Sequence, residues 1–354
     1  MRRVRLSQLN GNELLARDIF DDTGRILLSN GTKMYRKYIR LLEEREIYSV
    51  FIEDELSKGV VVEDFISDET RQEAKNVVKN TFEKFLDSNE TNVDNIKTSV
   101  GNIMEEIMSQ KGLMIASSEI RSASEWLFSH SVNVCALSVI VGNKMGYNAL
   151  KLNDLAVGAM LHDIGSIVLP KEIIKNPDSL NEEHNKIFKR HVLEGYKKLK
   201  DNVEVTAYAK VIALMHHEHC DGSGYPMGYT KEKLHEFVKI VTVCDAFDIM
   251  TSRRGKYKDM HVYKVVEYLV AMSDKLFDKD VVKVFTDNVT VYPNGDAIKL
   301  NNGEKGIVLS QNKGLPTRPK VRILFKDEYN DRTAYKNIDL AKEPTLFIVD
   351  ACYI

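Results

Sequence analysis

The histidines of this chain are crowded into one stretch of the sequence. Eight of the nine lie between residues 130 and 235. Two adjacent pairs stand out there, His162 with Asp163 and His216 with His217. Imidazole nitrogen and carboxylate oxygen are ligands for divalent transition metals, so the crowding indicates that metal coordination, rather than core packing, set these residue types. The fold must therefore bring these positions together.

Composition limits the class of protein. The 354 residues suit two or three domains, and 29% charged with 43% hydrophobic residues is typical of a soluble globular protein. The net charge of -2 gives no general attraction to a nucleic acid polymer or an anionic membrane, so any phosphate-binding surface must be local. We find no signal peptide and no run near the ~20 apolar residues of a membrane span, and expect a cytoplasmic protein. Cys135, Cys220, Cys244 and Cys352 lack CxxC spacing and are expected to be reduced thiols.

Hydrophobic periodicity divides the chain into four segments. Residues 1–60 mix β-like and helical patterns and predict a small α/β module of regulatory type. Residues 61–114 predict connecting helices, which could also form a homodimer seam, although packing within the chain is the simpler interpretation. Residues 115–283 predict a helical catalytic domain, and residues 284–354 a small β domain. The predicted fold class is thus multidomain α+β, with a central all-α domain between two small modules.

Individual elements follow from the same patterns. Apolar residues at three- and four-residue steps predict helices over residues 123–145, 149–162, 181–200, 203–218, 236–252 and 261–273. Two further apolar series predict helices in the connecting segment, the first capped by Ser67. Alternation predicts strands over residues 289–292, 307–309, 321–325 and 346–349.

The two pairs fall where predicted helices end. At the last turn of a helix, both side chains of a pair can lean past the end toward one ion, and the exposed carbonyl groups add negative potential there. Asp245 instead lies inside an apolar helical stretch, where an unpaired carboxylate would be costly. Either a metal or a buried ion pair must compensate it, and we favour the metal because the other ligands are already present.

His130 and His191 lie on helix faces with apolar neighbours. Either one alone is more typical of a hydrogen-bonded core histidine. Together with the two pairs and Asp245, they favour a ligand role. Asp248, one turn after Asp245, could orient a ligand, although a helix cap or a surface contact is an equally good interpretation.

These residues, taken in order, resemble the HD-GYP subgroup of the HD phosphohydrolase superfamily. The resemblance spans residues 115–260. It is specific, because the motifs follow one another in the family's order and include the Gly224-Tyr225-Pro226 signature. These motifs are His130-Ser131-Val132-Asn133-Val134, Leu161-His162-Asp163-Ile164-Gly165, Leu169-Pro170, Lys175-Asn176-Pro177, His191 with Gly195, the block beginning at His216, and Asp245 with Asp248. The resemblance implies an all-helical domain that hydrolyses cyclic di-GMP to linear pGpG and sometimes on to GMP.

The resemblance also implies a ligand set. The metal ligands would be His130, His162, Asp163, His191, His216, His217 and Asp245. They would hold two divalent ions, iron or manganese, with zinc also suited to nitrogen and oxygen ligands. Asp163 would bridge the ions. His162 and Asp163 would be catalytic in a mechanism where two ions roughly 3.5 to 4 Å apart activate a water as the nucleophile.

Substrate contacts are implied at five further positions. Lys175 and Arg254 would neutralise phosphates, although solvated surface charges are an alternative interpretation. Gly222 and Gly224 would let the loop approach the site. Tyr225 would stack on a guanine or on a partner protein, such as a diguanylate cyclase or another signalling protein, or would simply pack the loop.

Three departures from the family pattern leave other functions open. Ser166 stands where the family usually has a lysine, and Trp126 stands where three-metal members supply a glutamate, which favours two metals here. Residues 253–258 keep an arginine but lack the proline-tyrosine that usually follows it. One alternative is therefore a degenerate sensor that binds ligand or partner without turnover. Another is a hydrolase of a different cyclic dinucleotide or another phosphate compound.

Overall fold

The chain divides into two compact units. The structure is a computed structural model and describes residues 1–21, 24–62, 64–87, 93–110, 114–115, 126–175, 181–252, 255–257, 260–326 and 333–354. One unit contains both ends of the chain, Met1–Asp64 and Val289–Ile354, and the other contains the segments from Phe65 to Asn288 that carry the histidines.

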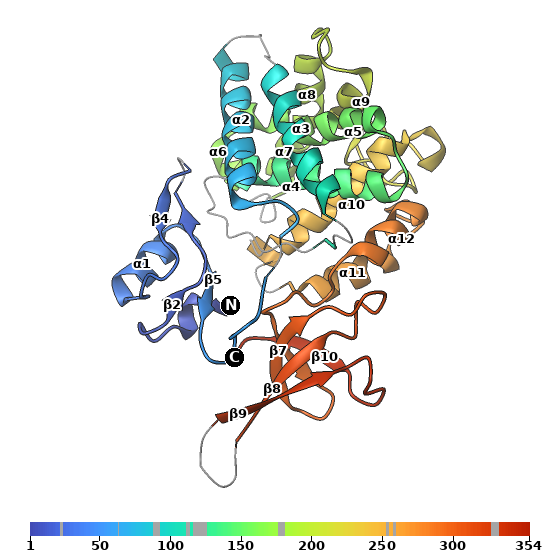
Figure 1. Cartoon of the computed structure of the whole chain (residues 1–354). Helices are drawn as coiled ribbons and strands as arrows, with labels where there is room; N and C mark the ends of the chain where they lie inside the picture. Colours follow the sequence, from blue (N-terminus) through green and yellow to red (C-terminus); the bar gives the residue numbers. More distant parts are fainter. Residues whose placement is uncertain are drawn as a thin grey trace. The chain divides into compact units, whose positions relative to one another are not determined.

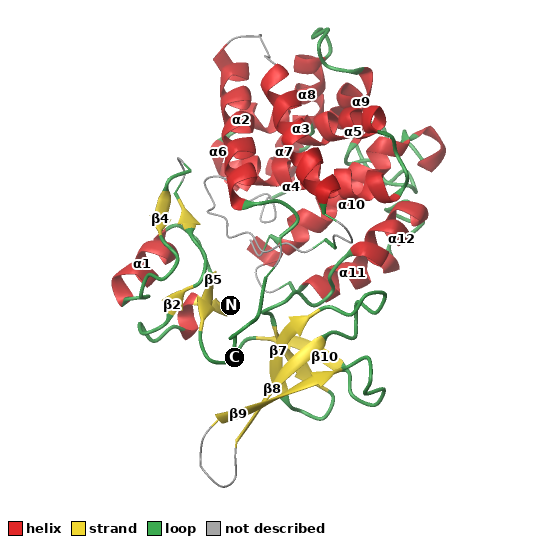
Figure 2. Ribbon diagram, in the orientation of Figure 1, coloured by secondary structure: helices red, strands yellow, loops and turns green. Residues whose placement is uncertain are grey.

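The histidine-bearing unit is built from helices, as predicted (Figure 1, Figure 2). In chain order these are α2 (Asp68–Asp87), α3 (Asp94–Ser109), α4 (Trp126–Lys144), α5 (Ala149–Leu161), the short 3-10 helix η3 (Ile164–Val168), α6 (Lys171–Lys175), α7 (Glu182–Phe188), α8 (His191–Leu199), α9 (Ala207–Met215), the 3-10 helix η5 (Lys231–Lys233), α10 (Glu236–Thr251), the 3-10 helix η6 (Gly255–Tyr257), α11 (Val262–Ala271) and α12 (Lys279–Asn288).

Helix α4 forms the core of this unit. It packs against α2, α3, α5, α10 and α12. Among the described residues it is the one helix long and apolar enough to cross a membrane, a test that the core helix of a folded domain also passes. Here 94% of the apolar stretch is buried within the unit, which matches a core helix.

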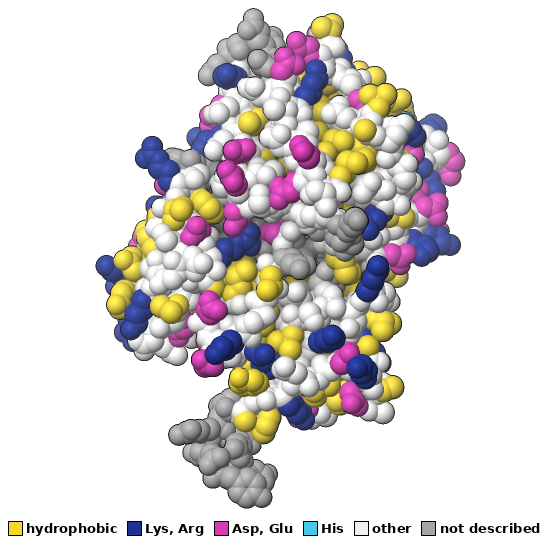
Figure 3. Space-filling model, in the orientation of Figure 1, with side chains coloured by type: hydrophobic (Ala, Val, Ile, Leu, Met, Phe, Trp, Pro, Cys, Tyr) yellow, Lys and Arg dark blue, Asp and Glu magenta, His cyan; other side chains and the backbone are white. Residues whose placement is uncertain are grey.

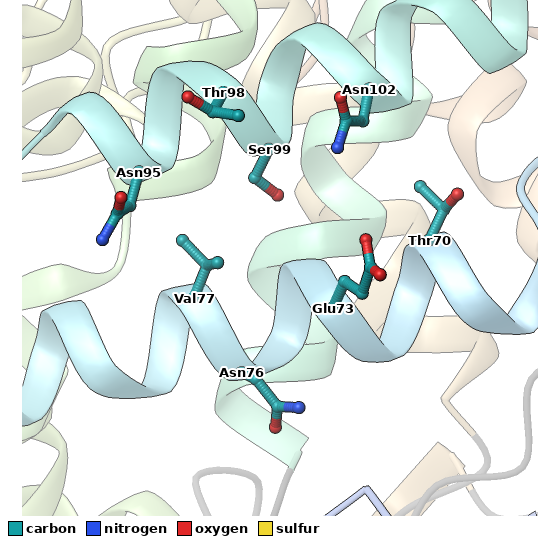
Figure 4. A pocket seen from close by; sticks show the side chains of 8 residues that line it. All are labelled: Thr70, Glu73, Asn76, Val77, Asn95, Thr98, Ser99 and Asn102. Carbon is teal, nitrogen blue, oxygen red and sulfur yellow. The ribbon is translucent and has the colours of Figure 1, made fainter.

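The connecting helices α2 and α3 also pack within the unit. Ser67 caps α2, because its Oγ accepts a hydrogen bond from the Thr70 N–H at 3.3 Å. The predicted apolar faces are buried, for example Val78 on α2 and Val100 on α3. Between the two helices lies a groove of about 400 Å³ whose lining is mostly polar (Figure 4). The apolar faces are thus covered within the chain, and the homodimer stays a prediction.

Three predictions about individual elements were wrong. The single helix expected over residues 181–200 is two helices, α7 and α8, with a break at Lys189 and Arg190. Residues 289–292 have strand composition but lie outside every strand, because alternation alone does not supply a neighbouring strand to pair with. The change to alternation was placed too early, since α12 continues to Asn288.

In the unit with both chain ends, the described residues form three antiparallel sheets. Strands β1 (Arg2–Arg5), β5 (Ser49–Glu53) and β2 (Leu14–Leu15) pair in the order β1-β5-β2, β3 (Ile19–Phe20) pairs with β4 (Ile26–Leu28), and α1 (Arg36–Glu44) accompanies them. The C-terminal sheet has the order β10-β6-β7-β8-β9, from β6 (Ala297–Leu300), β7 (Lys305–Ser310), β8 (Lys320–Lys326), β9 (Thr333–Asp339) and β10 (Ile348–Cys352). The small N-terminal module and the C-terminal β module were both predicted.

The two ends of the chain are joined within this unit. The Arg3 N–H donates to the Gly295 carbonyl at 3.1 Å, and Val60 packs with Ala297 and Ile307 in one apolar cluster. Positive and negative side chains are interspersed on the face of the molecule drawn in Figure 3. This pattern agrees with the net charge of -2, which indicates no general affinity for polyanions.

Gly165 allows a close backbone approach that we expect to be essential. A Cβ at this position would lie 2.0 Å from the His191 carbonyl oxygen and 2.3 Å from the Gly195 nitrogen, so η3 and α8 would have to separate. Gly165→Ala should cost about 1 to 3 kcal/mol, measured as a lower midpoint of denaturant unfolding. Gly101→Ala on α3 is the control, since nothing lies within 4 Å of its added Cβ. It should stabilise the protein by about 0.5 to 1 kcal/mol. Equal midpoints for the two variants would contradict this packing.

Candidate metal centre

Five helical elements deliver the seven predicted ligands to one place. His130 projects from α4, and Asp245 from α10. His162 and Asp163 follow the last residue of α5, and His216 and His217 follow the last residue of α9. His191 is the first residue of α8. The structure therefore brings together all seven predicted positions.

The ligand atoms form two groups. The His130 group contains His130, His162 and Asp245, and the Asp163 group contains Asp163, His191, His216 and His217. Within each group, one nitrogen or oxygen atom per residue lies within 4.8 Å of all the others. Six of these residues are buried, and His217 is partly exposed.

Main-chain carbonyl groups fix the tautomers of three histidines. The Nδ1 atoms of His162 and His191 lie 2.7 Å from the carbonyl oxygens of Ala159 and Phe188, and His216 Nδ1 lies 3.1 Å from that of Ile212. A carbonyl oxygen only accepts, so Nδ1 must carry the proton and Nε2 of the neutral ring must carry a lone pair. Burial supports the neutral form, because it lowers the pKa of His162 to about 4 and also lowers that of His191.

These lone pairs face one another. His191 Nε2 and His216 Nε2 are 3.2 Å apart, and Asp163 Oδ1 lies 3.2 Å from His191 Nε2. The buried Oδ1 atom of Asp163 receives no hydrogen bond from the part of the chain that is described. Electron-rich atoms repel at such distances unless a cation lies among them. The donor set therefore fits a metal ion.

Asp163 lies between the two groups. Its Oδ1 faces His191 and His216 at 3.2 and 3.6 Å, whereas its Oδ2 lies 3.8 Å from His162 Nε2 and 3.9 Å from His130 Nε2. Burial would raise the pKa of Asp163, but the nearby imidazoles outweigh that effect and lower it well below 3.8. One carboxylate oxygen thus faces each group, which suits the bridging role. That role stays a prediction.

His130 is held differently from the other histidines. Its Nδ1 lies 2.8 Å from Asp248 Oδ2, and its Nε2 lies 2.9 Å from Asp245 Oδ1. Burial alone would lower the pKa of His130, but the hydrogen bonds to these two carboxylates raise it to about 10. Asp248 is buried, so it orients His130 rather than capping a helix at the surface.

A cavity of about 220 Å³ adjoins both groups. Asp163, His217 and Asp245 form part of its wall, and Asn185, Ile249 and Ser252 add to it. Four aromatic side chains also line it, namely Trp126, Phe188, Tyr225 and Tyr257. Trp126 stacks on His130 with ring centroids 4.7 Å apart, and Tyr225 stacks on His217 at 4.8 Å. A planar organic ligand that enters the cavity would therefore meet aromatic surfaces beside the ligand cluster.

The loop that carries Tyr225 is fixed by Glu218, a residue for which the sequence suggested no role. The buried carboxylate of Glu218 accepts hydrogen bonds from the N–H groups of Met227, Gly228 and Tyr229, at 2.6, 3.2 and 3.0 Å. Its position directly after His217 is the one signal in the sequence that could have drawn attention to it.

The two glycines predicted to contact substrate shape this same loop. Gly222 has a φ of +80°, and a Cβ on Gly224 would lie 2.5 Å from the His217 carbonyl oxygen. Neither is among the residues that line the cavity. The substrate contact predicted for them stays a prediction.

One cation at the cavity was not singled out by the sequence, and the two expected cations stay predictions. Arg254 and the side chain of Lys175 lie outside the described residues. Ser166 is buried in η3 and does not line the cavity. Lys189, which the sequence did not single out, does line it, and its Nζ lies 4.9 Å from the centroid of the Tyr225 ring. Its place two residues before His191 was the available signal, but its direction depends on the break between α7 and α8.

Comparison with known proteins identifies the domain. Residues 114–281 match a model described as an HD domain, and residues 297–354 match one described as a KOW domain associated with HD domain. A solved structure of an HD-GYP protein from Bdellovibrio bacteriovorus aligns with a TM-score of 0.53 at 18% identity, covering 80% of this chain and 98% of that one. At that identity the alignment speaks for the fold alone.

Two curated relatives are named as cyclic dinucleotide phosphodiesterases. A cyclic di-GMP phosphodiesterase of Pseudomonas aeruginosa is 26% identical over 243 residues, which is 69% of this chain and 58% of that protein. A 3'3'-cGAMP-specific phosphodiesterase of Vibrio cholerae is 29% identical over 169 residues, 47% of this chain and 38% of that protein. The chain is an HD-GYP domain protein. This confirms the family resemblance, although the chain spans only about half the length of the curated relatives it matches.

We expect metal loading of the HD-GYP domain to release about one proton per chain between roughly pH 7 and 8. His130 carries the proton that must leave, since its pKa is raised to about 10, whereas burial keeps His162 and His191 neutral. By linkage, affinity for the more proton-sensitive ion should rise about tenfold per pH unit in this range. Calorimetry with Mn²⁺ in buffers of different ionisation enthalpy measures the release.

Asp248→Asn is the matched variant for this measurement. It removes the carboxylate that faces Nδ1, one of the two that raise the pKa of His130. Proton release and the pH slope should both decrease. Metal binding without proton uptake or release in the wild-type protein would contradict the assignment of a protonated His130.

Proposed function

We propose that this chain is a metal-dependent phosphodiesterase that hydrolyses cyclic di-GMP to linear pGpG, with GMP as the product of a second cleavage. One observation carries the proposal: buried imidazole nitrogens and a carboxylate oxygen face one another at 3.2 Å beside a cavity. The name of the Pseudomonas aeruginosa relative supports the substrate class. The aromatic lining suits a purine dinucleotide.

Each group would hold one divalent ion. His130, His162 and Asp245 would bind the first, His191, His216 and His217 would bind the second, and Asp163 would contact both. Iron and manganese suit this set of nitrogen and oxygen ligands, as does zinc. When bound, the ions would supply the Lewis acidity that activates water and stabilises charge on a phosphodiester.

The side chains around the cavity would bind and orient the substrate. Asp163 and Asp245 line the cavity and would repel a phosphodiester without compensating cations. Lys189 supplies a positive charge from the protein itself, and its Nζ lies over the Tyr225 ring of the cavity wall. The rings of Tyr225 and Trp126 offer stacking surfaces for a guanine base.

The catalytic test removes the pair that joins the two groups. His162→Ala combined with Asp163→Ala should abolish formation of pGpG and GMP by anaerobically prepared protein loaded with Fe²⁺ or Mn²⁺, measured by chromatography. Lys186→Ala is the control, because Lys186 is exposed on α7 and pairs with Glu182 at 3.1 Å. Product formation that survives the double substitution would refute the proposal. Tight ligand binding without product by fully metallated wild-type protein would instead favour the degenerate sensor.

Lys189→Ala tests substrate binding separately. Because Lys189 is expected to meet a phosphate that remains charged throughout the reaction, its loss should raise KM about tenfold and leave kcat within about threefold. Lys189→Arg should restore most of the affinity, and Lys186→Ala should behave as wild type. A KM unchanged in Lys189→Ala would exclude Lys189 from the substrate site.

A second candidate substrate is a different cyclic dinucleotide. The Vibrio cholerae relative is named for specificity toward 3'3'-cGAMP, and the predicted metal centre would act on phosphorus rather than on a base. Rates for cyclic di-GMP, 3'3'-cGAMP and cyclic di-AMP under the same conditions distinguish the two candidates. The signalling-protein partner proposed for the Gly-Tyr-Pro loop remains a prediction.

A further inference from the structure

A buried arginine on α2 is connected to the metal centre through hydrogen bonds. Arg71 lies in the first turn of α2, yet it is only 1% exposed. Its guanidinium donates to Asn133 Oδ1 on α4, and it also lies over the Phe65 ring, 5.1 Å from the centroid. Burying a guanidinium is costly unless hydrogen bonds compensate it, and Asn133 provides one such bond.

The hydrogen bonds continue from Asn133 to a metal ligand. Asn133 Nδ2 donates to Asp248 Oδ1 at 3.2 Å, and Asp248 Oδ2 accepts from His130 Nδ1 at 2.8 Å. Asn133, Asp248 and His130 are each no more than 1% exposed. The path from Arg71 to His130 is therefore shielded from water along its length.

Chemistry fixes the direction of every bond on this path. A guanidinium only donates, so Asn133 must present its oxygen to Arg71 and its amide hydrogens to Asp248. The Asp248 carboxylate then accepts from both Asn133 and His130. Because His130 Nδ1 keeps a proton, Nε2 is the ring nitrogen that remains for a metal. Arg71 thus fixes which way the Asn133 amide faces, and the Asp248 carboxylate fixes the tautomer of His130.

We propose that Arg71 is a positioning residue for the ion of the His130 group, acting through Asn133 and Asp248. The proposal rests on the metal centre described under the proposed function. It does not extend to the Asp163 group. Within the described residues, the path reaches the metal ligands at His130, and no hydrogen bond joins Arg71, Asn133 or Asp248 to a member of the Asp163 group. Loss of Arg71 should therefore weaken the binding of one ion and leave the binding of the other unchanged.

Mn²⁺ binding to the full chain tests this selectivity. Wild-type protein should bind two ions. Arg71→Met should bind one ion with wild-type affinity and the other about 10- to 100-fold more weakly, as is typical when a residue that orients a ligand is lost. Arg71→Lys, which still donates to Asn133, should recover part of the loss. Anomalous diffraction from manganese-loaded crystals should show reduced occupancy at the His130 group.

Val78→Ala controls for general loosening of α2. Val78 is fully buried on the same helix, and its apolar side chain cannot take part in the hydrogen-bonded path. This variant should lower the unfolding midpoint yet bind both ions as the wild type does. The proposal would be overturned if Arg71→Met bound both ions equally more weakly, or if Val78→Ala lost affinity for the same single ion.

A second variant keeps the test independent of folding. Should Arg71→Met not fold, Asn133→Ala interrupts the same path from α4, and it should weaken the same single ion. Wild-type affinity for both ions in either folded variant overturns the inference while leaving the metal centre intact. Absence of metal binding in the wild-type protein overturns the proposed function itself, so the two failures are distinguishable.

Discussion

The metal centre depends on hydrogen bonds from imidazole Nδ1 atoms to main-chain carbonyl oxygens. In His162, His191 and His216, the acceptor lies three or four residues earlier in the chain. Helix ends provide such acceptors, because a carbonyl group there keeps a lone pair for a side chain, even where it also accepts from a main-chain N–H as Ile212 does. Each bond leaves Nε2 bare and directs it toward the centre. Local helix geometry therefore prepares the ligand atoms before any ion binds.

The seven positions that come together at the candidate metal centre could be predicted because they depend on local order in the sequence. A His-Asp pair at the end of a helical pattern keeps its meaning wherever the helix packs. Lys189 could not be found in this way, because the pattern over residues 181–200 predicted one continuous helix. The break between α7 and α8 places Lys189 at the cavity and His191 at the start of α8. His191 and Gly195 of α8 also lie against Gly165 of η3, a tertiary contact that periodicity does not record.

Long-range relations account for the other differences between prediction and structure. The sequence suggested two separate small modules at the ends of the chain, each with its own pattern. The structure places both ends in one compact unit, where Val60 shares an apolar cluster with Ala297 and Ile307. Alternation shows which face of a strand is apolar, but it does not show what covers that face. Periodicity therefore could not predict contacts between segments more than 200 residues apart, such as the hydrogen bond from Asn294 to the Val61 carbonyl.

The Gly-Tyr-Pro loop connects the substrate cavity to the ligands by direct contact. Gly224 has no side chain, which lets the loop lie against the His217 carbonyl, and Glu218 holds the following residues through three main-chain hydrogen bonds. Tyr225 is thereby held against the His217 ring, and Lys189 Nζ lies over the Tyr225 ring, 4.9 Å from its centroid. A ligand that displaces Tyr225 would also disturb His217. The Tyr225 ring on the cavity wall and the His217 ring of the Asp163 group therefore belong to one aromatic stack.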